Sequence, residues 1–159
     1  MLQSWTPNLH AFVVHFPIVL LMTAAAADLL SATLRRPGWL VPMGASLYLA
    51  GAIMAFVAFW SGTLAVDTVF LPGMARPLVG DHRRWALATT TVAGAVALMQ
   101  MAVFMSGAPW NRPRRLALAV AGLLTALLVY QTAERGARLV YEQGVGVIAA
   151  PAPAEGAAQ

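Results

Sequence analysis

Cysteine and lysine are both absent from this chain of 159 residues, and only 10% of its residues are charged, whereas about a quarter is usual in soluble domains. Without cysteine, the chain cannot form disulfides, thiolate metal sites, iron–sulfur clusters or c-type haem attachments. Hydrophobic residues make up 60% of the sequence, and the mean hydropathy is +0.71. An ordinary water-soluble globule is therefore excluded, and the length fits one domain.

Four stretches of the chain contain no charged residue, and each is long enough to cross a bilayer. They end at Asp28, at Asp67, at Arg112 and at Glu134. A hydrocarbon core about 30 Å thick needs roughly 20 apolar residues in a helix. We therefore predict an all-α membrane protein with four transmembrane helices in an up-down bundle. The expected helices cover about residues 9–33, 40–62, 82–106 and 114–135.

These four helices are expected to form a single domain over residues 1–147. Between the second and third helices, Pro72, Gly73 and Pro77 indicate a short loop, and Asp81 is expected to cap the third helix. The segment 148–159 is rich in alanine and proline and is predicted to be disordered.

A cleaved signal peptide is the alternative interpretation of the first hydrophobic stretch. The run Ala24–Ala26 resembles a cleavage site, but no lysine or arginine precedes Arg35, so the basic region of a signal peptide is missing. We therefore expect the first helix to stay in the membrane, with the N-terminus outside.

Arginines and tryptophans at the helix ends predict the orientation in a bacterial inner membrane. Two compact loops are basic and contain no acid, and we assign them to the cytoplasm, which leaves both termini periplasmic. The arginines of these loops are Arg35, Arg36, Arg112, Arg114 and Arg115. Tryptophans favour the headgroup level. Those expected at the outer face are Trp5, Trp60 and Trp85, and those at the inner face are Trp39 and Trp110.

The isoelectric point of about 10.7 does not indicate nucleic-acid binding. A nucleic-acid surface needs basic residues clustered on a soluble face, whereas these arginines are scattered over helix ends. The lipid bilayer is therefore the expected partner, and nucleic acid is not.

All three histidines are expected in the outer half of the membrane. His10 and His15 are about 140° apart on an unbroken helix, and Pro17 is expected to kink it because the hydrogen bond to the Val13 carbonyl is lost. His15 lies deeper, where an unpaired polar ring is costly, so we expect it to face the bundle. A polar and small stripe on the third helix is expected to face it. The stripe consists of His82, Ala86, Thr89, Ala93 and Gln100.

Neutral imidazole is the usual axial ligand of b-type haem and a good ligand of copper or zinc. The first hypothesis is a haem b electron-transfer protein with His15 and His82 as axial ligands and Arg83 or Arg84 near the propionates. A second hypothesis is a cofactor-free accessory or assembly subunit of a membrane complex. A third is metal or proton handling at the outer face. Its candidate ligands are His10, His15, His82 and Asp67.

Other residues offer less chemistry. Asp28 is an acid inside a span, but it lies seven residues before Arg35 on the same helix face and is expected to pair with it. No phosphate loop, nucleophile elbow or paired carboxylate motif is present, so any enzymatic role is limited to electron transfer. Small residues are expected to serve helix packing. They are Gly44, Gly51, Gly94, Ala97, Gly122 and Ala126.

Several motifs occur in a characteristic order. The pattern His-x4-His-Phe-Pro begins at His10, and the later motifs are Asp28-Leu29-Leu30, Asp81-His82-Arg83, Leu139-Val140-Tyr141 and Gly144-Val145-Gly146-Val147. Over residues 9–147, the chain thereby resembles the bacterial membrane family catalogued as domain of unknown function 2231. The resemblance implies four helices, outside termini and a redox setting near periplasmic c-type cytochrome modules or other membrane subunits. The resemblance also implies a histidine just before the Gly144-Val145-Gly146-Val147 stretch, where this chain has Gln143.

Overall fold

The computed structural model describes residues 9–34 and 38–147, and the described part is built from helices. Hydrophobic runs without charges favour helices here, because a helix satisfies every backbone hydrogen bond within its own segment. In chain order, the elements are α1 (Leu9–Val13), α2 (His15–Thr33), α3 (Leu40–Ala65), the 3-10 turn η1 (Gly73–Ala75), α4 (Arg76–Met105) and α5 (Arg112–Tyr141).

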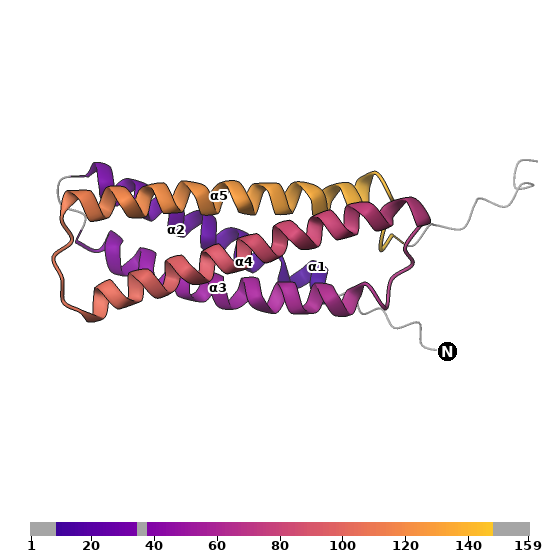
Figure 1. Cartoon of the computed structure of the whole chain (residues 1–159), viewed down its shortest axis with the longest axis horizontal. Coiled ribbons are helices and arrows are strands. Elements are labelled where there is room, and N and C mark those ends of the chain that lie inside the picture. The colour runs from indigo at the N-terminus through magenta and orange to yellow at the C-terminus, as the bar shows by residue number, and fades with distance from the viewer. Residues whose placement is uncertain (1–8, 35–37, 148–159) are drawn as a thin grey trace, which may run out of the picture.

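The four long helices form an up-down bundle in which each packs against two neighbours (Figure 1). Helix α2 contacts α3 and α5, and α4 contacts the same two helices from the other side. We call the end at which α1 begins, α3 ends, α4 begins and α5 ends the histidine end. The other end, where α4 ends and α5 begins, is called the opposite end.

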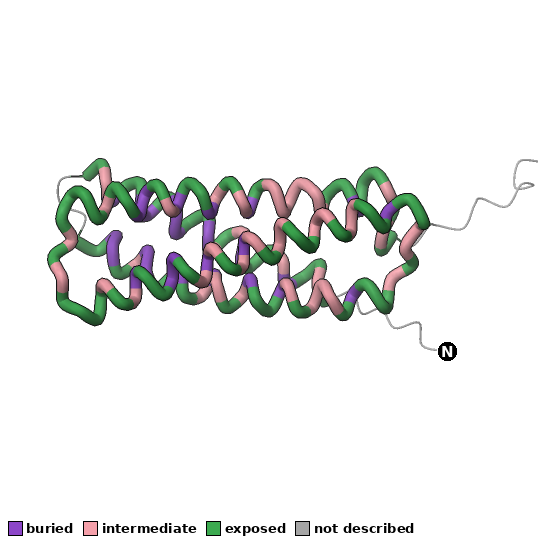
Figure 2. Tube along the Cα trace, viewed as in Figure 1, coloured by how far each residue is buried: buried purple, intermediate pink, exposed green. Residues whose placement is uncertain are grey.

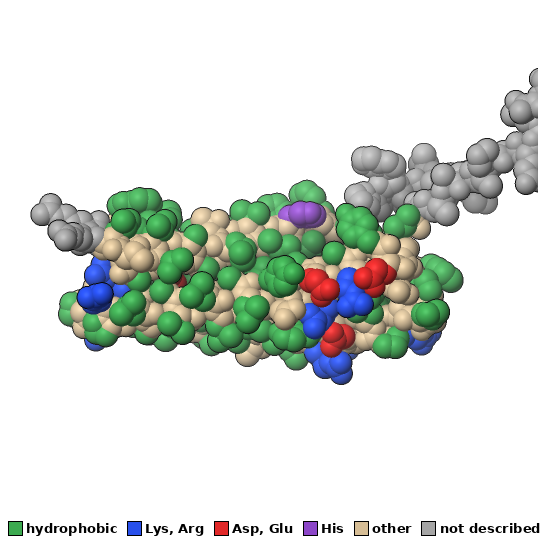
Figure 3. All heavy atoms as spheres, turned by 90° about the horizontal axis from the view of Figure 1, so that it is seen from above, with side chains coloured by type: hydrophobic (Ala, Val, Ile, Leu, Met, Phe, Trp, Pro, Cys, Tyr) green, Lys and Arg blue, Asp and Glu red, His purple; other side chains and the backbone are tan. Residues whose placement is uncertain are grey.

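The surface of the bundle is that of a membrane protein. Large hydrophobic side chains are exposed along every long helix, and buried positions lie along the inside of the bundle (Figure 2). Figure 3 shows hydrophobic side chains over most of one face, with a patch of acidic and basic side chains toward one end. All four helices are long and apolar enough to cross a membrane. The prediction of an all-α protein with four transmembrane helices is confirmed.

Two helix boundaries differ from the sequence prediction. Helix α4 begins at Arg76 because Pro77 occupies its first turn, where proline loses no hydrogen bond. Asp81 therefore lies inside α4 and does not cap it, contrary to expectation. Helix α5 begins with a cap in which Asn111 Oδ1 accepts from the backbone N–H of Arg114 at 3.2 Å, and it continues to Tyr141, beyond residue 135.

The first span is interrupted at Val14, between α1 and α2. Pro17 has no backbone N–H, so the carbonyl of Val13 lacks its usual helical partner, as the sequence indicated. The interruption places α1 against the end of α3 as well as against α2. This arrangement carries His10 toward α3.

Three of the predicted packing glycines bring helices into close contact. A Cβ atom would lie 2.9 Å from Asp28 Oδ1 at Gly44, 2.7 Å from Leu21 Cδ2 at Gly51, and 3.2 Å from the Cα atom of Ala25 at Gly122. Gly94 meets nothing within 4 Å, so its predicted packing role is wrong.

Trp60 and Trp85 lie toward the histidine end, and Trp39 and Trp110 at the opposite end, as predicted for the two headgroup levels. Some predictions concern positions outside the described residues. They are those on Trp5, Arg35, Arg36 and the tail 148–159.

Candidate functional site

Two histidines from different helices meet at the histidine end. His10 of α1 and His82 of α4 have ring centroids 6.4 Å apart, with their planes inclined by 77°. Each ring is partly buried in the bundle. The sequence analysis predicted that His15 of the first span faces the bundle, but in the structure His10 is the histidine that does so.

Each imidazole rests on a glycine of a neighbouring helix. A Cβ at Gly62 of α3 would lie 2.9 Å from Cε1 of His10, and one at Gly136 of α5 would lie 3.2 Å from Cε1 of His82. A larger residue at either position would push the ring away, so the two glycines make room for the pair. Sequence reasoning missed both of them, although each lies close to a predicted helix end at the level of the histidines.

Hydrogen bonds fix the orientation of both rings. Nδ1 of His82 lies 3.0 Å from the carbonyl oxygen of Thr132, which only accepts, so Nδ1 is the donor. Nδ1 of His10 lies 3.1 Å from Ser61 Oγ, which also lies 2.9 Å from the Ala58 carbonyl oxygen. When neutral, His82 therefore has its lone pair on Nε2, as in a metal-binding histidine whose other ring nitrogen is held by a hydrogen bond.

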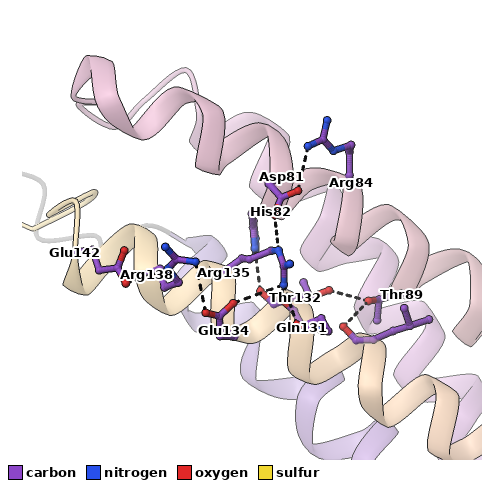
Figure 4. A network of polar contacts seen from close by, with 11 residues as sticks. Asp81, His82, Arg84, Thr89, Gln131, Thr132, Glu134, Arg135, Arg138 and Glu142 are labelled. Carbon is purple, nitrogen blue, oxygen red and sulfur yellow. Dashed lines mark hydrogen bonds and ion pairs between the residues drawn. The ribbon is translucent and has the colours of Figure 1, made fainter.

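A polar network between α4 and α5 surrounds His82 (Figure 4). Thr132 Oγ1 lies 2.8 Å from Thr89 Oγ1. Arg135 donates to Asp81 through Nε and to Gln131 through Nη1, and its guanidinium group lies 4.5 Å from the centre of the Trp85 ring. These contacts hold the two helices in register on both sides of His82.

The site lies close to the expected surface of the hydrocarbon core. Helices α4 and α5 are 30 residues long, which is about 45 Å, whereas the core is about 30 Å thick. If the core boundary at the opposite end lies at Arg115 on α5 and at Thr33 on α2, a span of twenty residues reaches the other boundary at Glu134 and at Val14. His10, His82 and Thr132 are therefore within about two turns of the expected boundary.

His15 does not face the bundle, and this prediction is wrong. His15 is exposed on the outer surface of α2, with Nδ1 3.3 Å from the Phe12 carbonyl oxygen. The angle of about 140° between His10 and His15 turns one ring inward and the other outward. On the third predicted helix, the inward stripe is confirmed for Thr89 and Gln100, which are buried.

The other predicted site residues lie outside the histidine pair. Arg83 is exposed, and Arg84 is exposed and pairs with Asp81 at 3.0 Å. Asp67 follows α3 and lines a shallow depression with Arg76. Within residues 9–34 and 38–147, no group of three or more His, Cys, Asp or Glu side chains is placed to hold a metal ion.

Asp28 also differs from expectation, because it lies in the bundle core with 1% exposure and does not extend to a surface. Gln100 Nε2 donates to Asp28 Oδ2 at 2.8 Å. The expected partner, Arg35, lies outside the described residues.

A family model described as predicted membrane protein (DUF2231) matches residues 6–149, which confirms the resemblance inferred from the motifs. No curated protein and no solved structure matches the chain.

Proposed function

We propose that this chain, which belongs to the DUF2231 family of predicted membrane proteins, binds copper or zinc between His10 and His82. The observation that supports this proposal most directly is the facing of two imidazoles from different helices, both oriented by hydrogen bonds at Nδ1. Imidazole nitrogen suits both metals.

Two protein ligands leave coordination positions open. Structural zinc sites usually have four protein ligands, whereas catalytic zinc sites keep one coordination position open for water or substrate. A pair of imidazoles near the membrane surface therefore suits metal exchange or a redox role better than a purely structural one. The histidine end would face the periplasm of a bacterial inner membrane, and a periplasmic c-type cytochrome or another membrane subunit would be the partner.

Haem b ligation with His82 as one axial ligand is the competing proposal. His15, the other axial ligand expected from the sequence, lies on the outer surface of α2. A haem bound by His82 would therefore need a second axial ligand other than His15. The visible spectrum of the purified protein distinguishes the two proposals. A Soret band with sharp bands after reduction would favour haem, and a colourless sample that contains metal would favour His10 and His82 as metal ligands.

Removal of either inward histidine is expected to weaken metal binding at least about tenfold, because loss of even an outer hydrogen-bonding partner commonly costs 10–100-fold in affinity. We would purify the full chain and the variants His10→Gln and His82→Gln in mild detergent. Affinities for Zn²⁺ and Cu⁺ would then be measured by competition with a chromophoric chelator.

His15→Gln is the matched control, because it removes a histidine of the same span that faces outward. It is expected to bind metal as the wild type does. Unchanged affinity in both inward variants would contradict the proposal, and so would an equal loss in His15→Gln. Helix content and elution volume would verify that each variant is folded.

A further inference from the structure

A second polar cluster lies in the core, toward the opposite end of the bundle. Asp28 of α2, Tyr48 of α3 and Gln100 of α4 are at most 1% exposed, although all three have polar side chains. Along α4, Gln100 is 18 residues from His82, which corresponds to about 27 Å. Apolar core residues, including Ala93 and Val96, lie between the two positions on α4. This cluster is therefore separate from the histidine pair.

The hydrogen bonds of the cluster are incomplete. Gln100 Nε2 donates to Asp28 Oδ2 at 2.8 Å, but Gln100 Oε1 is buried and has no hydrogen-bond partner among the described residues. The other carboxyl oxygen of Asp28 packs against Gly44, where a Cβ would lie 2.9 Å away. A buried acceptor without a donor is costly, so Gln100 Oε1 needs a hydrogen-bond donor.

Among residues 9–34 and 38–147, no cation forms an ion pair with Asp28. The ion pairs in this part of the chain all lie at the histidine end. The titratable group that faces Asp28 from α3 is Tyr48, and α4 contributes the neutral amide of Gln100. On α5, Gly122 lies against Ala25. By helical rise, Arg115 is then about 6 Å farther along the bundle axis than Asp28. Its Nε is buried and has no hydrogen-bond partner among the described residues, so it does not pair with Asp28 there. Within residues 9–34 and 38–147, an ionised Asp28 would therefore be a buried charge without an ion-pair partner.

We propose that Asp28 is a proton-binding site within the membrane, where burial favours the neutral carboxylic acid and Gln100 is placed to pair with it. A carboxylate and one proton combine to form the acid, whose O–H supplies the missing donor to Gln100 Oε1. The amide N–H of Gln100 continues to donate to the acid. A carboxylic acid and a primary amide are complementary, since each has one donor and one acceptor. One proton therefore removes both the unpaired charge and the unpaired acceptor.

A sodium ion is the alternative ligand, and the geometry favours it less. Hard cations prefer a shell of oxygen atoms, but the amide of Gln100 directs an N–H donor at the carboxyl group. A proton fits that arrangement without moving the amide. The experiment therefore separates the two ligands.

Infrared spectroscopy of the full chain in lipid nanodiscs tests the proposal, because a protonated carboxyl group has a C=O stretch that an ionised one lacks. At neutral pH in buffer without sodium, we expect this band in the wild type and its loss in Asp28→Asn, which is a neutral isostere. Asp67→Asn is the matched control, since Asp67 is exposed, and it is expected to retain the band. Gln100→Leu is expected to shift the band to higher frequency because the acid loses its hydrogen-bonded partner.

Three results would overturn the proposal. The first is the absence of the band in the wild type at neutral pH, and the second is its persistence in Asp28→Asn. The third is loss of the band when sodium is added at constant pH, which would make the site a sodium site. Metal affinity at the histidine end is expected to be unchanged in Asp28→Asn, so failure here leaves the proposed function standing.

Discussion

Replacement of Tyr48 by alanine is expected to lower the free energy of unfolding by roughly 3–5 kcal/mol, the usual cost of truncating a large buried aromatic side chain. Tyr48 is the largest fully buried side chain among the described residues and has 0% exposure. It belongs to the same core cluster as Leu21, Ala24 and Val129, which come from α2 and α5. Its removal would leave a cavity among three helices. Unfolding by SDS in mixed micelles, followed by circular dichroism, measures the change.

Tyr48→Phe is the matched control, because it keeps the buried ring and removes only the hydroxyl group. Loss of this one polar group is expected to cost much less than loss of the ring. A loss in Tyr48→Phe as large as that in Tyr48→Ala would contradict this account. It would show that the hydroxyl group, and not the packing of the ring, carries the stability.

The double variant Gly62→Val/Gly136→Val is expected to lose metal affinity by about 100-fold or more, although all three histidines remain. The added side chains occupy the space of the two rings, since a Cβ alone would lie 2.9 Å from His10 and 3.2 Å from His82. The rings would have to separate, and the hydrogen bonds at Nδ1 would be lost with them. Competition with a chromophoric chelator measures the affinity.

Gly80→Val is the control for this variant, because Gly80 also lies near the start of α4 but meets nothing within 4 Å. It is expected to bind metal normally. The single variants Gly62→Ala and Gly136→Ala add only a methyl group and are expected to show smaller losses. Wild-type affinity in the folded double variant would show that the two glycines do not position the rings.

The membrane fold could be predicted from the sequence because the absence of charge is a strong and local signal. Four long uncharged runs require helices in lipid, whatever the details of packing. The ends of the helices were harder to predict, since Pro77 is compatible with both a loop and the first turn of α4. The sequence alone does not distinguish these two uses of proline.

The histidine that turns inward could not be predicted, because spacing gives only the angle between two side chains on one helix. His10 and His15 are about 140° apart in either case, and the depth of His15 favoured the wrong one. The choice depends on how α1 packs against α3, where Gly62 leaves room for an imidazole. Similarly, the pairing of Asp28 with Gln100 joins residues 72 positions apart, which no local pattern reveals.

X-ray absorption at the metal edge of the zinc-loaded or copper-loaded full chain tests the central claim most directly. The account predicts two imidazole nitrogens in the first coordination shell at about 2.0–2.1 Å for zinc, and loss of the imidazole signal in the double variant His10→Gln/His82→Gln. A loaded wild type without imidazole ligands, or the same spectrum from the double variant, would contradict it.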